Sequence, residues 1–393
     1  MSLKSAIIAG TICLDIRPDL SKVPEGQFLT LLQPGKLIRV NGVSLTVGGA
    51  VGNAGLALHR LGTPVKLMGK IGTDRFGGLI QDILTEEDEH LAGNLVQDPG
   101  GTTSFSIILN PPGFDRTFLH APGVNDLFYA SDLPRATLKT ADLLHFGYPS
   151  LMRSIYRNGG GELVSILQRI RREGLTTSLD FSLPDLSSPA AQVDWPEVLA
   201  SSLPLADLFA PSVDELVFML DRATFDQLSS DPQRPLHEVV SPELLHGLSD
   251  EVLSYGVKAL LVKLGRRGVY LRTAGASTWE RGGRGLAGLG ADWHSRELWA
   301  PAYQVEVAGT TGAGDAAVAG FLSSVLRGAS PETALRMAAA VGAACVEAGN
   351  VLVGVDDWER MLARVEAGWE TLPLNLTGAG WRKDEKNGLW HQA

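Results

Sequence analysis

The glycine-rich segment GTTGAGDAAVAG, at residues 309–320, limits what this chain can fold into more than any other stretch. Before it, residues 303–307 alternate between apolar and polar side chains, as a β-strand does. After it, residues 315–326 carry apolar side chains at helical spacing. The pattern predicts a tight turn that joins a strand to a helix.

The start of that helix has the properties of an anion site with a base attached. The first N–H groups of a helix lack partners within it, so the amides of Ala313, Gly314 and Asp315 are expected to bind a phosphoryl oxygen. Gly312 and Gly314 carry no side chain that would block a phosphoryl group from reaching these amides. The carboxylate of Asp315 repels phosphate but is suited to accept a proton from an attacking hydroxyl. The combination indicates phosphoryl transfer to an alcohol.

Two other interpretations of the same turn compete with this one. Residues 312–317 also fit the dinucleotide fingerprint GxGxxG/A, which is a weak signal by itself. That fingerprint should lead to a second strand, whereas residues 330–346 begin another helix. This segment alone does not distinguish a functional turn from one with a purely structural role.

Composition excludes several classes of function. The chain has 393 residues, of which 44% are hydrophobic and 20% charged, enough for one large α/β domain or two smaller ones. A net charge of -10 argues against nucleic acid or an anionic membrane as a partner, and no apolar run reaches the length of a membrane span. Cys13 and Cys345 are the only cysteines and have no metal-binding spacing. We therefore expect a cytoplasmic protein.

The N-terminal part predicts a site for hydroxyl groups. Residues 6–10 form a buried-strand run, and Asp15 follows it, at the edge where α/β sheets bind ligands such as polyols. In a second glycine-rich turn, Gly48 and Gly49 allow close backbone approach, and the Asn53 amide offers both a donor and an acceptor. An ordinary turn aspartate and a helix N-cap asparagine are the alternatives.

A small second sheet is expected outside the main one. Four segments have strand-like patterns: residues 28–32, 37–47, 103–109 and 116–120. The last two flank a hairpin-like turn at residues 110–115. We expect these segments, contributed by residues 16–47 and 103–120, to pair with one another.

Taken in order, these motifs resemble the ribokinase or PfkB family of carbohydrate kinases. Two signatures carry the resemblance, at residues 48–77 and 310–315, and shorter matching segments lie between them. The resemblance covers about residues 5–370. It implies a three-layer α/β/α sandwich with a mostly parallel central sheet and a small β-sheet lid. It places the kinase domain at residues 1–376 and a tail at 377–393.

The resemblance also implies a role for each matching residue. Asp315 would be the general base on the acceptor hydroxyl. Further implied groups are an anion hole from the amides of Gly312, Ala313 and Gly314, a sugar site from Asp15, Gly48, Gly49 and Asn53, and a nucleotide site from Lys263, Gly265, Gly268 and Thr310. ATP and Mg²⁺ would be the cofactors, a sugar the small-molecule partner, and the lid a surface for a homodimer.

Three departures from the family pattern limit these implications. Gly309 stands where the family usually has an aspartate that helps to hold a monovalent cation, so the need for such a cation stays open. Ser212 replaces the usual asparagine and leaves Glu215 to order Mg²⁺ through water, with Asp214 as a substitute. Residues 273–299 form a long insertion, expected to be a solvated hairpin extension or a mobile loop over the nucleotide side.

The sequence thus predicts ATP-dependent phosphorylation of a hydroxymethyl group on a sugar or sugar-like substrate. A nucleoside kinase is the first alternative, with Phe28, Phe105 and Phe118 as candidate platforms for a base. A catalytically impaired sugar-binding sensor is the second. Arg39 and Arg116 would favour an acidic or phosphorylated sugar if they face the substrate, but the pattern does not name the sugar.

Overall fold

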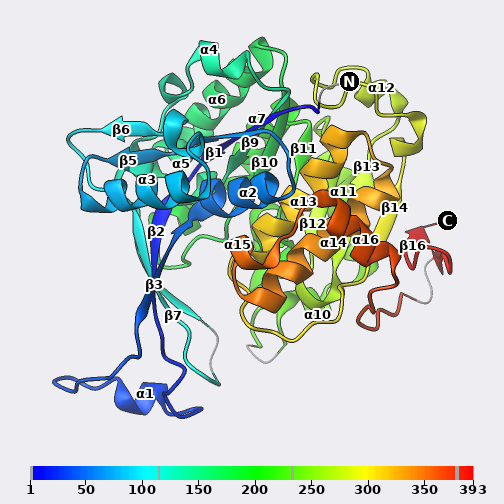
Figure 1. Cartoon of the computed structure of the whole chain (residues 1–393). Coiled ribbons are helices and arrows are strands. Elements are labelled where there is room, and N and C mark those ends of the chain that lie inside the picture. The colour runs from blue at the N-terminus through cyan, green and yellow to red at the C-terminus, as the bar shows by residue number, and fades with distance from the viewer. Residues whose placement is uncertain (1–2, 114–115, 232–233, 377–379, 393) are drawn as a thin grey trace.

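The core of the protein is a ten-stranded sheet with the strand order β15-β16-β14-β13-β12-β11-β10-β9-β1-β4 (Figure 1). The computed structural model describes residues 3–113, 116–231, 234–376 and 380–392; parts of the expected 110–115 turn and of the tail lie outside them. The six strands from β4 to β12 are parallel to their neighbours, and the remaining pairings are antiparallel. The strands are β1 (Ala6–Gly10), β4 (Val65–Met68), β9 (Leu143–Gly147), β10 (Thr176–Asp180), β11 (Leu208–Phe209), β12 (Ala259–Lys263), β13 (Val269–Thr273), β14 (Glu297–Ala300), β15 (Trp381–Lys383) and β16 (Trp390–Gln392).

The central strands are buried on both faces, as their continuous apolar runs predict. Every residue of β1, β9 and β10 is buried. Their register pairs Gly10 with Gly147, and Gly147 with Asp180, so the three strands end at the same level. Parallel sheets bind ligands at this carboxyl edge.

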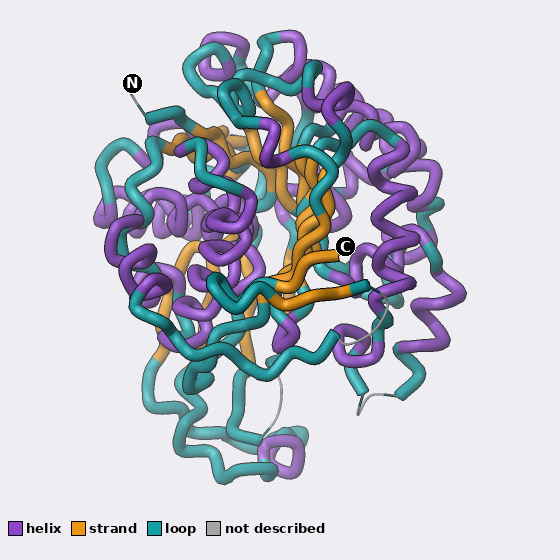
Figure 2. Tube along the Cα trace, turned by 90° about the vertical axis from the view of Figure 1, so that its right-hand side faces the viewer, coloured by secondary structure: helices purple, strands orange, loops and turns teal. Residues whose placement is uncertain are grey.

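Helices cover both faces of the sheet and form the outer layers (Figure 2). One hydrophobic core includes side chains from α2 (Gly49–Arg60), α3 (Arg75–Glu87), α13 (Ala313–Arg327), α14 (Pro331–Ala348) and α16 (Trp358–Glu366). The other includes side chains from α6 (Gly161–Arg172), α7 (Trp195–Ser202), α8 (Val213–Leu220) and α11 (Pro242–Ser254). The expected three-layer sandwich is confirmed. Among the described residues, none of the helices combines the length and apolar character needed to cross a bilayer.

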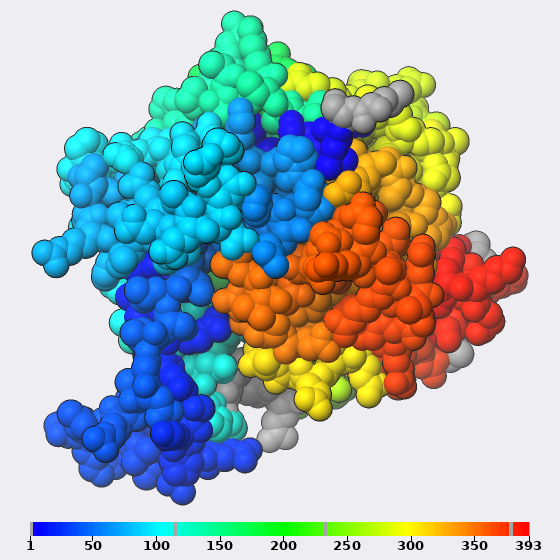
Figure 3. Space-filling model, viewed as in Figure 1, coloured from blue at the N-terminus to red at the C-terminus, as the bar shows by residue number. Residues whose placement is uncertain are grey.

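A smaller sheet, which we call the lid, projects from the body (Figures 1 and 3). Its strand order is β3-β2-β7-β8, with bounds β2 (Cys13–Pro18), β3 (Val43–Gly48), β7 (Phe105–Leu109) and β8 (Thr117–Ala121). The strands expected at 103–109 and 116–120 are therefore present. A further two-stranded sheet pairs β5 (Lys70–Gly72) with β6 (Val96–Asp98).

The predicted strands at 28–32 and 37–47 are largely wrong. Phe28–Leu31 is a short helix, α1, and regular pairing begins only at Val43. The physical reason is local packing: Phe28 is buried against Leu20 and Val23 in a small core of the lid's own. Apolar spacing in such a short segment does not distinguish a strand from one helical turn.

The predicted strand at 303–307 is also wrong. Tyr303 forms only an isolated bridge with Thr371, and the following residues form a loop. The amides of this loop bond to other segments, with Ala308 and Gly309 both donating to the carbonyl of Val346. The glycine-rich turn thus follows a loop that is fixed against α14.

The insertion at 273–299 is a hairpin extension between the antiparallel strands β13 and β14, with many exposed residues, but part of it is packed and it does not lie over the candidate site. Its ends belong to β13 and β14, and between them Trp293 is only 1% exposed. The Arg284 side chain donates to the carbonyls of Ala141 and Glu173, next to the amino ends of β9 and β10. A side chain on Gly283 would lie 2.2 Å from the Thr176 amide. The insertion therefore covers the edge of the sheet opposite to its carboxyl edge.

The described part of the C-terminal tail extends the sheet. Strand β16 pairs with β14, and Trp390 lies opposite Trp299. Trp381 on β15 is buried, with its ring 5.9 Å from that of Trp299. Aromatic packing of this kind holds residues 380–392 against β14.

Gly268 provides a test of backbone packing between β12 and β13. It has φ of +88°, and a Cβ there would lie 2.0 Å from the carbonyl oxygen of Ala300. We expect Gly268→Ala to lower the free energy of unfolding by roughly 2–4 kcal/mol, measured by urea denaturation. Gly288 has the same φ with open space around it, so Gly288→Ala should cost only about 1 kcal/mol. Equal losses in the two variants would contradict a steric role for Gly268.

Candidate active site

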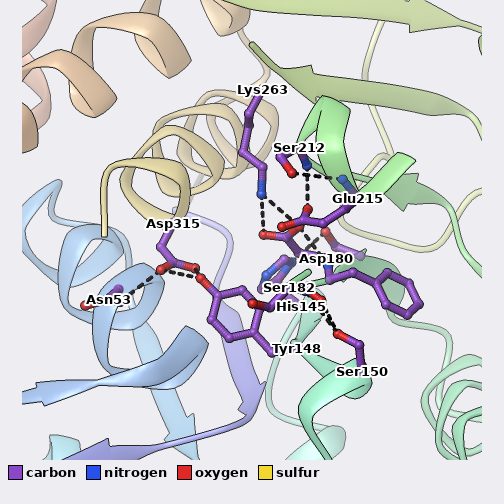
Figure 4. A network of polar contacts seen from close by, with 12 residues as sticks. Asn53, His145, Tyr148, Ser150, Asp180, Ser182, Ser212, Glu215, Lys263 and Asp315 are labelled. Carbon is purple, nitrogen blue, oxygen red and sulfur yellow. Dashed lines mark hydrogen bonds and ion pairs between the residues drawn. The ribbon is translucent and has the colours of Figure 1, made fainter. Parts of the chain in front are cut away.

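The candidate active site lies at the carboxyl edge of the sheet, where several elements converge (Figure 4). The glycine-rich turn leads into α13, and α2 lies beside it. Tyr148, Asp180 and Lys263 stand at the ends of β9, β10 and β12. Residues from distant parts of the sequence thus surround one carboxylate, that of Asp315.

The turn before α13 leaves several amides open. Gly312 is the N-cap residue with φ of +78°, a conformation that favours glycine. The Ala313 amide bonds back to the carbonyl of Thr310 at 3.3 Å. Within the part of the chain that the structure describes, the amides of Gly312, Gly314 and Asp315 have no hydrogen-bond acceptor. These three N–H groups can bind an anion.

Asp315 is buried and accepts hydrogen bonds on both oxygens. The exposed fraction of the residue is 2%. The hydroxyl of Tyr148 donates to Oδ1 and Oδ2, both at 2.7 Å, and Asn53 Nδ2 donates to Oδ2 at 2.9 Å. Burial raises the pKa of Asp315, while hydrogen bonds from Tyr148, the charge of Lys263 and the Asn53 bond oppose the rise. A carboxylate with a raised pKa in a closed site is suited to accept a proton.

Asn53 lies inside α2 and is not its N-cap, which is Gly48. Its amide crosses to Asp315 on α13, and a Cβ on Gly312 would lie 3.2 Å from the Asn53 carboxamide. The contact fixes the two helices at the point where the two glycine-rich turns meet. The structure thus brings the early and late motifs together.

Asp15 lies in lid strand β2 and not directly after β1. A Cβ on Gly48 would lie 2.2 Å from Asp15 Oδ2, so only glycine fits beside this carboxylate. The Cys13 thiol donates to Oδ1 at 3.3 Å. Burial raises the pKa of Asp15 to about 6. Gly49, with φ of +74°, packs its backbone against the Thr11 carbonyl.

Lys263 is held by Asp180 beside the late turn. Its Nζ lies 2.7 and 2.8 Å from the two Asp180 oxygens. A Cβ on Gly314 would be 3.5 Å from Lys263 Cδ. Burial acts to lower the pKa of Lys263, but the charges of Asp180 and Glu215 outweigh it and the pKa is raised. The ammonium group therefore stays charged next to the open amides.

The other predicted nucleotide residues are Gly265, Gly268 and Thr310. Gly265 packs against the ring of His237, and Gly268 against the backbone at Ala300. Thr310 is exposed and lines the cleft under the lid. Close packing thus accounts for glycine at positions 265 and 268 without any contact to a nucleotide.

Glu215 caps its own helix, α8. Its carboxylate accepts from the Ser212 amide at 2.5 Å, and its own amide donates to Ser212 Oγ at 3.2 Å. Serine is an effective cap here, which explains how the chain tolerates the loss of the usual asparagine. Burial raises the pKa of Glu215, and the charge of Lys263 opposes the rise. The side chain faces the Asp180 and Lys263 pair (Figure 4).

Sequence reasoning missed Tyr148 and gave Asp180 no role. Both stand at the ends of buried parallel strands, which is a detectable signal for a ligand-facing position. Tyr148 follows Gly147 and has φ of +64°, a conformation that is rare for a residue with a side chain. Its partner on α13 is distant in sequence, so no local pattern connects the two.

A cleft of about 810 Å³ separates the lid from the turn. Arg17 and Arg116 from the lid line one side, and residues 307–311 line the other. Arg17 Nη1 crosses to the carbonyl of Gly349 at 3.2 Å. Arg39 is an exposed residue of the lid. The cleft thus lies between the lid and the start of the late turn, next to the buried Asp315.

Sequence comparison identifies the family. The pfkB family carbohydrate kinase profile matches residues 19–357. The chain belongs to the PfkB family of carbohydrate kinases. It is 28% identical over 286 residues to the "Probable fructokinase-6, chloroplastic" of Arabidopsis thaliana, covering 71% of this chain and 62% of that protein. The match therefore spans less than two thirds of that relative.

Solved structures of this family share the fold. A fructokinase with bound ATP from Xylella fastidiosa superposes with a TM-score of 0.66 at 20% identity, covering 93% of this chain and 99% of the other. A putative ribokinase II from E. coli, in complex with ATP and Mg²⁺, gives 0.65 at 20% identity, covering 93% and 100%. The ribokinase-like fold predicted from the motifs is thus confirmed.

The raised pKa of Asp15 predicts how stability changes with pH. The folded-state pKa of about 6 exceeds the ordinary value of 3.8, so the folded state binds the proton more tightly. Wild-type stability should therefore fall as pH rises through this range. Asp15→Asn should be more stable than wild type at pH 8, by at most about 3 kcal/mol, and the difference should close by pH 4.

Denaturant unfolding at pH 4 to 8 measures this difference. Asp19 is an exposed neighbour on the lid whose pKa is lowered, mainly by its hydrogen bonds with Ser21. Asp19→Asn should therefore give no gain at pH 8. A stability gap for Asp15→Asn that stays constant over the whole range would contradict the shifted pKa.

Proposed function

We propose that the protein transfers the γ-phosphoryl group of ATP to a hydroxymethyl group of a sugar or sugar-like substrate. The observation that carries the proposal is the buried Asp315 carboxylate, which lies beside open amides and 2.9 Å from Asn53. A base and an anion site next to a polar pocket are the parts that this transfer requires. Family membership supports the same reaction class.

Each group has a task in the transfer. Asp315 accepts the proton of the acceptor hydroxyl as its oxygen attacks the γ-phosphorus, and the bond to the ADP oxygen breaks. The amides of Gly312, Gly314 and Asp315 stabilise the charge on the phosphoryl oxygens. Lys263 adds a fixed positive charge beside them. Asp15 and Asn53 orient the sugar through its hydroxyl groups.

The site fits Mg²⁺ held mainly by the nucleotide. Asp180 and Glu215 place two carboxylates beside one ammonium group, which leaves negative charge near the phosphates. No group of three or more His, Cys, Asp or Glu side chains suited to hold a metal occurs in the described ranges. Mg²⁺ commonly keeps waters and binds phosphates with one or two carboxylates. Mg²⁺ would neutralise phosphate charge, and Glu215 would reach it through water. The neighbour from E. coli was solved with ATP and Mg²⁺.

The residues fit a monovalent cation poorly. Gly309 supplies no carboxylate, and its amide shares the Val346 carbonyl with that of Ala308. The Arg17 guanidinium already donates to the neighbouring Gly349 carbonyl. The carbonyls of Val346 and Gly349 beside this position thus already accept hydrogen bonds from the protein.

The alternatives have less support. A sensor without catalysis does not require a base, yet Asp315 is buried beside open amides. For a nucleoside, Phe28 is excluded as a platform because it is buried in the lid's own core. Phe105 packs edge-on against Phe76 with ring centroids 5.4 Å apart. Phe118 is 46% exposed and remains a candidate.

The lid also offers a surface for a second copy of the chain. Val43 and Leu45 lie on one face of β3, since they are two residues apart, and both are exposed. Phe118 and Leu119 on β8 are exposed as well. We propose that a homodimer covers part of this apolar surface.

A coupled ADP-release assay over a panel of sugars and nucleosides tests the function. Sugar-dependent ADP formation is the expected result. Release with nucleosides alone would favour the nucleoside kinase. Binding of a sugar, seen by calorimetry, without ADP release from any compound would favour the sensor.

Asp315→Asn tests the base directly. We expect turnover to fall at least about a hundredfold with nearly unchanged ATP affinity, because the amides remain while the proton acceptor is lost. Steady-state kinetics and calorimetry measure the two effects. Glu332→Gln, in the first turn of α14, makes the same charge change at another helix start and should retain activity. Near-normal turnover of Asp315→Asn would remove the role of base from this residue.

A further inference from the structure

Tyr148 occupies the place where a substrate hydroxyl would have to meet the base. Its hydroxyl lies 2.7 Å from each oxygen of Asp315, so one donor spans both proton-accepting atoms. A general base must lie within roughly 2.6–3.2 Å of the hydroxyl that it deprotonates. The phenol therefore makes the hydrogen bonds to the base that an acceptor hydroxyl would have to make.

The backbone holds Tyr148 in this place at a cost. Its φ of +64° is left-handed, and such strain persists only where neighbouring structure fixes it. The Tyr148 amide donates to the Asp180 carbonyl at 3.0 Å, and its carbonyl accepts from Leu151. A Cβ on the preceding Gly147 would lie 2.1 Å from that of Ala50. The backbone at Tyr148 is thus anchored by β10 and packed closely against α2, while the ring extends from it toward Asp315.

The phenol donates its proton and does not accept one. Burial and the charge of Asp315 raise the pKa of Tyr148 well above its ordinary value, so the hydroxyl stays protonated. Figure 4 shows its ring between Asp315 and the other polar residues of the site. In this position the Tyr148 hydroxyl occupies an acceptor site on each oxygen of the base, where a water molecule would otherwise bind.

We propose that Tyr148 is a positioning residue that guards Asp315 against water until a sugar hydroxyl displaces it. The inference rests on the proposed kinase function. The reaction prevented is hydrolysis of ATP: water oxygen bonds to the γ-phosphorus, the bond to the ADP oxygen breaks, and the water proton passes to Asp315. The products are ADP and inorganic phosphate. A sugar hydroxyl differs from water because Asn53 and Asp15 bind the rest of its molecule, which provides the energy for displacing the phenol.

Tyr148→Phe tests the guard, because it removes the hydroxyl and leaves room for a water at the base. We expect sugar-free ADP release to rise at least about tenfold over wild type. In Tyr148→Phe/Asp315→Asn the rise should disappear, because the activated water needs the carboxylate. Tyr255→Phe is the matched control: its hydroxyl bonds to Glu251 on the surface, and its loss should leave ADP release unchanged.

The outcomes separate this inference from the kinase function. Sugar-dependent ADP release by wild type is measured first, and its absence with every sugar would overturn the proposed function together with the guard. If wild type and Tyr148→Phe both phosphorylate a sugar but hydrolyse ATP equally slowly in the absence of sugar, the proposed role of Tyr148 is wrong and the kinase function stands. A rise that persists in the double variant would also overturn it.

Discussion

Burial of the Asp315 carboxylate is the constraint on which the arrangement of the site depends. A buried charge costs several kcal/mol unless hydrogen bonds and nearby charges compensate it. Here the compensation comes from the amino end of α13, from Asn53 on α2 and from Tyr148 after β9. Because these groups come from three elements, the carboxylate is stable only when the sheet and both helices are assembled. The hydrogen bonds that stabilise the Asp315 carboxylate therefore also join the sheet to the two helices.

A second set of charges extends this logic toward the nucleotide. Asp180 and Glu215 are buried near Asp315, and burial raises the pKa of each. Lys263 is the cation that pairs with Asp180. Three carboxyl groups, those of Asp180, Glu215 and Asp315, thus lie near one cationic side chain, that of Lys263. A metal ion carried by the nucleotide would supply further positive charge to this cluster. In the proposed reaction, binding of the nucleotide with its metal ion would therefore also balance the charge of these carboxyl groups.

The sequence was most informative where chemistry depends on local backbone geometry. The late turn, its helix and the need for glycine at position 48 follow from spacing and from the lack of a Cβ. Tyr148 and the Asp180–Lys263 pair were not predictable as contacts, because they depend on strand order and on how far each strand extends. The error at 303–307 has a similar cause: alternation is present, but no neighbouring strand is available to pair with it. The burial of Trp293 shows that even a Gly-rich insertion can pack when a neighbouring helix offers an aromatic contact, here Phe321 of α13.

In the proposed reaction, the lid strand β2 connects sugar binding to the contact between the lid and the body. Side chains two residues apart on a strand point to the same face, so Asp15 and Arg17 project from the same side of β2. Asp15 lies against Gly48, while Arg17 reaches the Gly349 carbonyl of the body. A lid motion that breaks the Arg17 contact must also move Asp15, since a short paired strand shifts as a unit. In the proposed reaction, a sugar bound to Asp15 would therefore favour the same lid position as the Arg17 contact.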